Sequence, residues 1–139
     1  MAAKDIFHEK VKSALIKDGW QVTHDPLELS YGKVELQIDL GAENLIAAEK
    51  EAERIAVEIK SFIEPSKVYA FHLALGQYIN YKRALRANDA DRKLFMAITE
   101  DILQSFFLKQ EMTQDAILED DLQLIVFDPE KEEIVQWIS

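Results

Sequence analysis

The sequence predicts an α/β fold in which helices flank a mixed β-sheet. Helix-type and strand-type hydrophobic patterns follow one another in the order α-β-β-β-α-β-α-β. A long helical pattern lies between two apolar strand-like runs, as a parallel crossover requires. The 139 residues contain 48% hydrophobic residues and no repeat, low-complexity tract or Pro/Gly-rich linker. A single domain over residues 1–139 is therefore expected.

The N-terminal segment is expected to be a helix followed by a short strand. Apolar residues recur at helical spacing over residues 5–18. Asp5 is a residue type that caps helices, and Gly19 is suited to end this one. Residues 20–23 then have the composition of a short first strand.

Three further strand patterns precede the middle of the chain. After the turn at residues 25–26, residues 34–40 alternate strictly between apolar and polar side chains. This pattern is typical of a half-buried strand, with Asp39 on its polar face. Residues 45–49 and 54–60 are strand-like runs joined by a charged link, which predicts a hairpin and places the second run centrally in the sheet.

The second half of the chain is expected to alternate helices with strands. In chain order, these are a helix from Ser66 to about residue 87, a strand at 94–98, a helix at about 100–108, and strands at 122–127 and 134–138. The strand at 94–98 suits a parallel crossover, and the last strand is expected at an edge of the sheet. Gly76 is expected to let the long helix approach the sheet closely.

Composition excludes several kinds of chemistry. The chain has no cysteine, so disulfides, thiolate chemistry and cysteine-based zinc sites are excluded, and any metal must be held by oxygen or histidine. No apolar run approaches the length of about 18 residues that a membrane span needs. The N-terminus also lacks a signal-peptide pattern, so a cytoplasmic protein without a membrane span is expected.

The charge of the chain restricts its possible partners. The net charge of −10 argues against general nucleic-acid binding, because phosphate contacts come from lysine and arginine. A role on DNA therefore requires a local basic patch or a partner. The clearest basic segment is 82–86, with Arg92 and Lys93 shortly after it.

The strand-like run 55–62 contains the strongest candidates for chemistry, Glu58 and Lys60. Side chains two residues apart point to the same face of a sheet, whereas the apolar residues that alternate with them mark the other face as core. An unpaired buried charge costs several kcal/mol. A ligand or a function is therefore expected at this pair.

An acidic residue on one strand followed by Glu-x-Lys on the next is the arrangement that metal-dependent phosphodiester cleavage requires. Two carboxylates hold a hard divalent cation such as Mg²⁺ or Mn²⁺. The lysine orients the attacking water or stabilises the charge that develops on the phosphate. Glu58 and Lys60 fit these roles. The preceding acid is Asp39, Glu43 or Glu49, of which Asp39 is favoured.

Three more residues are candidates for the same site. Gln77 and Tyr81 lie four apart on the predicted long helix and share a face, so both can reach the edge of the site. Gln77 suits a metal-bound water or a phosphate, and Tyr81 suits the nucleic-acid backbone. Glu9 in the first helix is a candidate third carboxylate for the same metal.

Each candidate also has a purely structural interpretation. Glu58 and Lys60 would then form a salt bridge, Asp39 would be solvent-exposed, and Gln77 and Tyr81 would be packing residues. The histidines show no ligand spacing such as His-Glu-x-x-His and are interpreted as surface or satisfied core residues. They are His8, His24 and His72.

Ordered motifs extend along nearly the whole chain, at residues 5–9, 14–20, 23–26, 39–43, 47–50, 55–62, 74–78 and 124–129. Together they resemble the XisH-type fdxN-element excision controlling factors of cyanobacteria. The resemblance implies a PD-(D/E)XK restriction-endonuclease-like core with the order α-β-β-β-α-β. It also implies a role in programmed excision of a DNA element, as a Mg²⁺-dependent endonuclease or as a DNA-processing accessory to a site-specific recombinase.

The wider superfamily's pattern implies roles for particular residues. Glu9 matches the first-helix acid, Asp39 the acid before the hairpin, Glu58 and Lys60 the core motif, and Gln77 with Tyr81 the Gln-x-x-x-Tyr element of RecB-like nucleases. One departure is that no proline precedes Asp39. The spacing from Asp39 to Glu58 also exceeds that of the tightest resolvase-like hairpins, so Glu43 stays an alternative metal ligand.

The resemblance also implies partners. These are DNA, a site-specific recombinase in the same pathway and a small XisI-like companion protein. Nuclease-like folds often pair to address two DNA strands, so a homodimer is one expected assembly. The rival hypothesis is a non-catalytic control factor that keeps the fold and acts by binding the companion protein, which the acidic net charge favours.

Overall fold

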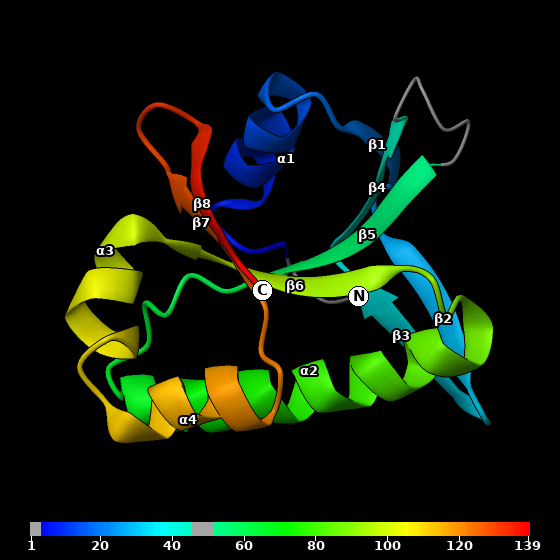
Figure 1. Cartoon of the computed structure of the whole chain (residues 1–139). Helices are drawn as coiled ribbons and strands as arrows, with labels where there is room; N and C mark the ends of the chain where they lie inside the picture. Colours follow the sequence, from blue (N-terminus) through cyan, green and yellow to red (C-terminus); the bar gives the residue numbers. More distant parts are fainter. Residues whose placement is uncertain (1–3, 46–51) are drawn as a thin grey trace.

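A computed structural model describes residues 4–45 and 52–139 as a mixed β-sheet between helices (Figure 1). The strands of the sheet, in spatial order, are β1 (Gln21–His24), β4 (Leu40–Leu45), β5 (Ala52–Ile59), β6 (Lys93–Thr99), β7 (Leu124–Asp128) and β8 (Glu133–Ile138). A separate hairpin is made of β2 (Leu27–Tyr31) and β3 (Val34–Ile38). The helices are α1 (His8–Lys17), α2 (Lys67–Asn88), α3 (Glu100–Ile102) with the π-helical turn η1 (Leu103–Phe107), and α4 (Glu111–Glu119).

The strand pairing confirms the predicted mixed sheet. β5 pairs in parallel with β6, and β6 in parallel with β7, whereas the pairs nearer the edges are antiparallel. α2 makes the predicted crossover between β5 and β6, and Ser66 caps it, because the Ser66 Oγ accepts a hydrogen bond from the Tyr69 N–H at 3.2 Å. β5 therefore lies in the interior of the sheet, as expected.

Two hydrophobic cores lie on the two faces of the sheet. α1 covers one face and α2 covers the other, with α4 beside α2 (Figure 1). Ile55, Val57 and Ile59 of β5 are buried in the core under α1, and Ala56 is buried in the core over α2. The side-chain alternation that the sequence predicted for this strand is confirmed, and it directs Glu58 to the α2 side.

The start of α1 differs from the prediction. The helix begins at His8, and Asp5 precedes it instead of capping it. One carboxylate oxygen of Asp5 accepts a hydrogen bond from the Phe7 N–H at 2.9 Å, and the other accepts one from the Ser61 N–H at 3.0 Å. Asp5 therefore ties the beginning of α1 to the segment after β5. Gly19 ends the helix as predicted, with a φ of +94°.

The expected continuous strand over residues 34–40 is wrong. β3 ends at Ile38, the chain bends at Asp39, and β4 begins at Leu40 in a different sheet. Ile38 and Leu40 are both fully buried, but Ile38 packs in the core beside α2 and Leu40 in the core beneath α1. The apolar residues before and after the bend are both buried, so the alternating pattern continues through residue 39 and does not reveal the bend.

The predicted hairpin is also shifted along the chain. Its first strand is β4, which ends at Leu45, and its second strand is β5, which begins at Ala52. Most of the first strand that was expected, residues 46–49, lies outside the described residues.

One helix was missed from the sequence, and one expectation about a helix is wrong. α4 was not predicted, because only Thr113 and Ala116 of its residues are buried and the helical period is correspondingly weak. Gly76 is exposed, and outside its chain neighbours and the nearby backbone of its own helix no described atom lies within 4 Å of the position that a Cβ would occupy, so it serves no close approach to the sheet. No helix in the described part of the chain is long and apolar enough to cross a membrane.

The buried Tyr78 joins α2 to the sheet through its hydroxyl group. The hydroxyl lies 3.1 Å from the Leu94 carbonyl oxygen and 3.2 Å from that of Asp121, and it accepts a hydrogen bond from the Gln123 N–H at 3.0 Å. Burial raises the pKa of Tyr78 to about 12, so the hydroxyl keeps the proton that it donates.

Substitution of Tyr78 by Phe is expected to destabilise the fold by about 1–3 kcal/mol, because buried main-chain groups lose their partner while the ring remains. Urea denaturation measures the change. Tyr69→Phe is the matched control, since the Tyr69 side chain is largely exposed. Equal stability of the two variants would contradict this account.

Candidate functional site

A cavity of about 600 Å³ lies beside the end of β5, and five of the predicted site residues line it. They are Asp39, Glu58, Lys60, Gln77 and Tyr81. The bend before β4, the end of β5 and the middle of α2 each supply part of this group. The structure therefore brings together the residues that were chosen from strand alternation and helical spacing.

Two hydrogen bonds tie Asp39 to the end of β5. The Asp39 N–H donates to Glu58 Oε1 at 3.3 Å, and the Ile59 N–H donates to Asp39 Oδ2 at 2.7 Å. The register of β4 and β5 causes this arrangement, because Leu40 pairs with Val57 and the preceding Asp39 comes to lie beside Glu58. Of the two candidate acids that the structure describes, Asp39 and Glu43, Asp39 is the one that lies beside Glu58 in the cavity.

Lys60 lies on the same side of the strand as Glu58, as predicted. Its Nζ is 3.5 Å from Glu58 Oε2 and donates a hydrogen bond to Gln77 Oε1 at 2.5 Å. Gln77 of α2 therefore positions the ammonium group beside the carboxylates. Gln77 is exposed, and it can still reach the Lys60 ammonium because the Lys60 side chain is only partly buried.

The electrostatics of the cavity are dominated by burial of Glu58, whose residue is only 6% exposed. Its pKa is raised to about 8, first by burial and second by the negative charge of Asp39, while the positive charge of Lys60 acts in the opposite direction. The salt bridge to Lys60 is therefore too weak to offset burial and the second carboxylate. Positive charge is in deficit at this pair.

Tyr81 lies in the same electrostatic environment. Burial raises the pKa of its phenol, and the nearby charges of Glu58 and Asp39 raise it further. The phenol consequently stays protonated at neutral pH. Tyr81 can act there as a hydrogen-bond donor but not as a base.

Two of the other predicted acids, Glu43 and Glu9, are not brought to this cavity. Glu43 of β4 pairs with Arg54, several residues along the strand from Glu58, and does not line the cavity. Glu9 of α1 is exposed and does not line it either. The position of Glu9 does not support the expectation that it supplies a third carboxylate to this site. Asp5 and His8, at the start of α1, line the cavity instead. Glu49 lies outside the described residues.

Residues from the N-terminal segment that the sequence did not indicate line the cavity as well. His8 is 3% exposed, and its Nε2 lies 2.7 Å from Asp25 Oδ1. Lys12 Nζ donates to the other oxygen of Asp25 at 2.9 Å. Burial opposes ionisation of Asp25, but the hydrogen bonds from Lys12 and His8 hold the pKa of Asp25 below its usual value.

His8, Glu9 and Asp25 have ligand-type atoms within 4.8 Å of one another, but the Lys12 ammonium already neutralises Asp25. No sequence spacing connects His8 to Asp25, since they are 17 positions apart. The interpretation of the histidines as surface or satisfied core residues holds for His24 and His72, which are exposed, but not fully for His8. His8 is a core residue whose Nδ1 has no partner among the described residues.

The fold and this cavity define a mixed α/β protein with a carboxylate pair and a lysine at the end of an interior strand. The family model described as "XisH protein" matches residues 1–135. The chain therefore belongs to the XisH family, as its motifs indicated.

Two solved structures are similar to the chain over nearly its whole length. A crystal structure of an XisH family protein from Nostoc punctiforme PCC 73102 is 43% identical with a TM-score of 0.87, covering 97% of this chain and 100% of that one. A crystal structure of a fdxN element excision controlling factor protein from Anabaena variabilis is also 43% identical, with a TM-score of 0.86, and covers 98% and 100%. Among proteins with curated descriptions, none matches the chain significantly.

Substitution of Glu58 by Gln is expected to change how stability depends on pH when a chelator is present. The folded protein keeps a proton on Glu58 up to about pH 8, whereas the unfolded chain loses it near 4.5. The free energy of unfolding therefore falls as pH rises through this window, with a slope approaching about 1.4 kcal/mol per pH unit. Glu58→Gln lacks this component.

Urea denaturation at several pH values measures the slope. Glu133→Gln, at an exposed position of β8, is the control and is expected to keep the wild-type slope. A wild-type protein whose stability rises between pH 5 and pH 8 relative to Glu58→Gln would overturn the electrostatic description of the cavity.

Proposed function

We propose that this chain is a DNA-element excision controlling factor that acts as a Mg²⁺-dependent DNA endonuclease. The observation that carries the proposal is the arrangement of Asp39, Glu58 and Lys60 in one cavity. The description of the Anabaena variabilis structure as a fdxN element excision controlling factor supports the biological role.

The topology supports a PD-(D/E)XK nuclease-like core. Within the main sheet, the order α1, β1, β4, β5, α2, β6 reproduces α-β-β-β-α-β. The β2–β3 hairpin is then an insertion between the first and second strands of that core. The hairpin of β4 and β5 brings the two carboxylates together, as such a core requires.

The donor set suits a hard divalent cation. Asp39 and Glu58 offer carboxylate oxygens, which Mg²⁺ and Mn²⁺ prefer, and the raised pKa of Glu58 shows that the pair lacks positive charge. Asp39 and Glu58 would hold the cation, which when bound supplies Lewis acidity and lowers the pKa of a bound water.

The remaining residues of the cavity would handle the phosphate group. Lys60, positioned by Gln77, provides a point charge beside the carboxylates, where negative charge on a phosphate increases during cleavage. Tyr81 provides a neutral phenol that can donate a hydrogen bond to a phosphate oxygen. These roles require the DNA backbone to enter the cavity from the solvent side of Gln77.

Purified protein is expected to cleave DNA in the presence of Mg²⁺ or Mn²⁺ and to lose this activity with a chelator. Glu58→Gln, Asp39→Asn and Lys60→Gln are each expected to lower the rate by roughly a hundredfold or more, because each removes a charge at the reacting phosphate or its cation. Gel assays of supercoiled and linear DNA measure cleavage.

Glu43→Gln is the matched control, because Glu43 was the alternative metal ligand and lies outside the cavity. It is expected to retain wild-type activity. Loss of cleavage in Glu43→Gln with full activity in Asp39→Asn would reverse the assignment of the acids, and no cleavage by the wild-type protein with either cation would refute the endonuclease proposal.

A second candidate function is a non-catalytic control factor that binds a small XisI-like companion protein, in a pathway that includes a site-specific recombinase. The observation that favours it is an apolar surface at the start of α2, which we call the α2 patch. It consists of Val68, Tyr69 and Leu73, whose exposed fractions are 45%, 63% and 55%. Apolar side chains exposed together on one helix are typical of protein–protein contacts.

Under this second function, the double variant Tyr69→Ser/Leu73→Ser is expected to bind an XisI-like protein at least about tenfold more weakly, because the apolar contact area is lost. Glu58→Gln is expected to bind normally. Isothermal titration calorimetry measures the affinities.

Ile16→Ser/Val34→Ser is the control, since both of these side chains are exposed outside the α2 patch. Excision in cells then separates the two functions. Excision that survives Glu58→Gln but fails in the α2-patch variant supports the control factor, and the reverse result supports the endonuclease.

A further inference from the structure

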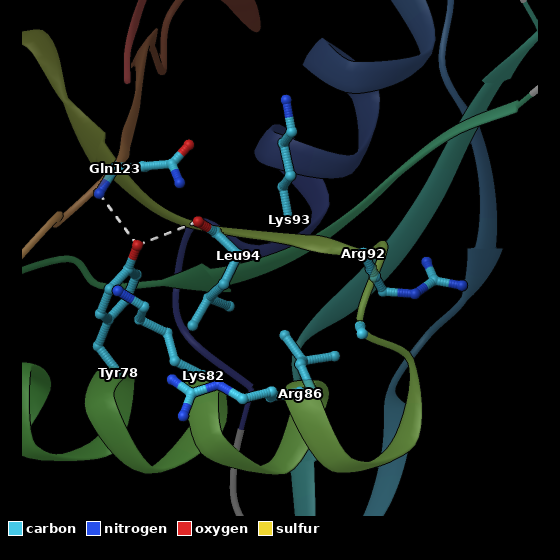
Figure 2. Close-up of a pocket in the computed structure, with 9 residues that line it drawn as sticks. Tyr78, Lys82, Arg86, Arg92, Lys93, Leu94 and Gln123 are labelled. Carbon is cyan, nitrogen blue, oxygen red and sulfur yellow. Dashed lines mark hydrogen bonds between the residues drawn. The ribbon is translucent and has the colours of Figure 1, made fainter.

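A second, smaller hollow of about 190 Å³ lies between the C-terminal half of α2 and the beginning of β6 (Figure 2). It shares no lining residue with the cavity that contains Glu58. Among the described residues that line it, four are basic and none is acidic, although the whole chain has 26 acidic and only 16 basic residues. The basic residues are Lys82, Arg86, Arg92 and Lys93.

The basic side chains do not contribute equally to this hollow. Lys82 and Arg86 lie four apart on α2 and extend to the same side of it, and the Gln123 side chain lies across from them (Figure 2). Lys93 points away from this pair in the same view. Arg92 is occupied, because its guanidinium donates to Asp89 and to the Ile55 carbonyl oxygen. Lys82, Arg86 and Gln123 are therefore the donors that a ligand would meet.

These donors are only weakly engaged within the protein. Arg86 and the side-chain amide of Gln123 make no hydrogen bond or ion pair with any residue that the structure describes. Lys82 donates to the Asp120 carbonyl oxygen at 3.3 Å and lies 4.0 Å from an oxygen of the exposed Asp121. A ligand at this place therefore competes with two weak contacts of Lys82 and does not have to break a buried ion pair.

The hollow has a rigid floor. The Tyr78 hydroxyl lies 3.1 Å from the Leu94 carbonyl oxygen and accepts a hydrogen bond from the Gln123 N–H, so α2, β6 and the segment before β7 are fixed relative to one another. The backbone positions of Lys82, Arg86 and Gln123 are thus fixed before any ligand arrives, and only their side chains remain to be ordered. Such preorganisation lowers the entropic cost of binding.

We propose that this hollow binds a phosphate group, with Arg86 and Lys82 as charged donors and the Gln123 amide as a neutral donor. A guanidinium with an ammonium one helical turn away is suited to the geometry and charge of a phosphate. A volume of about six water molecules accommodates one such group. The phosphate belongs either to a DNA backbone or to a free phosphate ion, since the donors are the same for both.

Binding at the hollow does not depend on catalysis at the cavity with Glu58, so the experiment is done with a chelator present. The probes are inorganic phosphate and a short DNA duplex at low ionic strength. Nuclear magnetic resonance follows the side-chain amide of Gln123 and reports whether a probe binds at this place, and the titration gives the affinity.

The double variant Lys82→Gln/Arg86→Gln is expected to bind about a hundredfold more weakly, from a loss of about tenfold for each charge-assisted hydrogen bond. The matched control is Lys33→Gln/Arg83→Gln, which removes the same total charge at exposed positions that do not line the hollow. It is expected to change the affinity by less than about threefold, because exposed charges act only through a screened field. The single variant Arg86→Gln repeats the test with a smaller change, and circular dichroism verifies that each variant folds.

A shift of the Gln123 amide with both probes supports the proposal and identifies a free phosphate as an accepted ligand. A shift with DNA alone supports it and identifies a backbone phosphate. No shift with either probe, or an equal loss of affinity in the control variant, would overturn it. Glu58→Gln is expected to leave this binding unchanged, so a failure of the endonuclease proposal and a failure of this one are distinguishable.

Discussion

The bend at Asp39, and the hydrogen bond that its carboxylate accepts from the Ile59 N–H at 2.7 Å, determine how the rest of the site is assembled. The bend ends β3 and releases the chain into β4, so that the β2–β3 hairpin stays outside the main sheet. The hydrogen bond joins the bend to the end of β5. Asp39 is thereby held against Glu58, and the cavity opens where these two segments meet α2.

This contact places two carboxylates together with one partly exposed lysine. Burial and the charge of Asp39 together raise the pKa of Glu58 to about 8, so at neutral pH the pair takes up a proton in place of a missing positive charge. α2 supplies Gln77 and Tyr81 to this cavity, and on another side it supplies Lys82 and Arg86 to the phosphate-sized hollow. One helix thus contributes both to the site with two carboxylates and to a hollow lined by basic residues.

Most of the fold was predictable because its signals are local. Hydrophobic period and Gly19 identify α1 within a few residues, Ser66 identifies the start of α2, and apolar runs identify the parallel strands β6 and β7. The sequence did not predict the bend at Asp39, because an alternating pattern looks the same on both sides of a bend. It did not predict α4 either, because that helix buries too few residues to show a period.

The sequence by itself determined that Glu58 and Lys60 share one face of a mostly buried strand, because side-chain direction alternates within a strand whatever surrounds it. Only the tertiary structure decided which acid accompanies them. Asp39 and Glu43 differ little in local pattern, and the register of β4 on β5 brings Asp39 to Glu58 and carries Glu43 to Arg54. Likewise, α1 begins at His8 with the His8 side chain at the cavity, so the next residue, Glu9, does not line it. Register and helix start depend on contacts between segments distant in the chain, which no local pattern encodes.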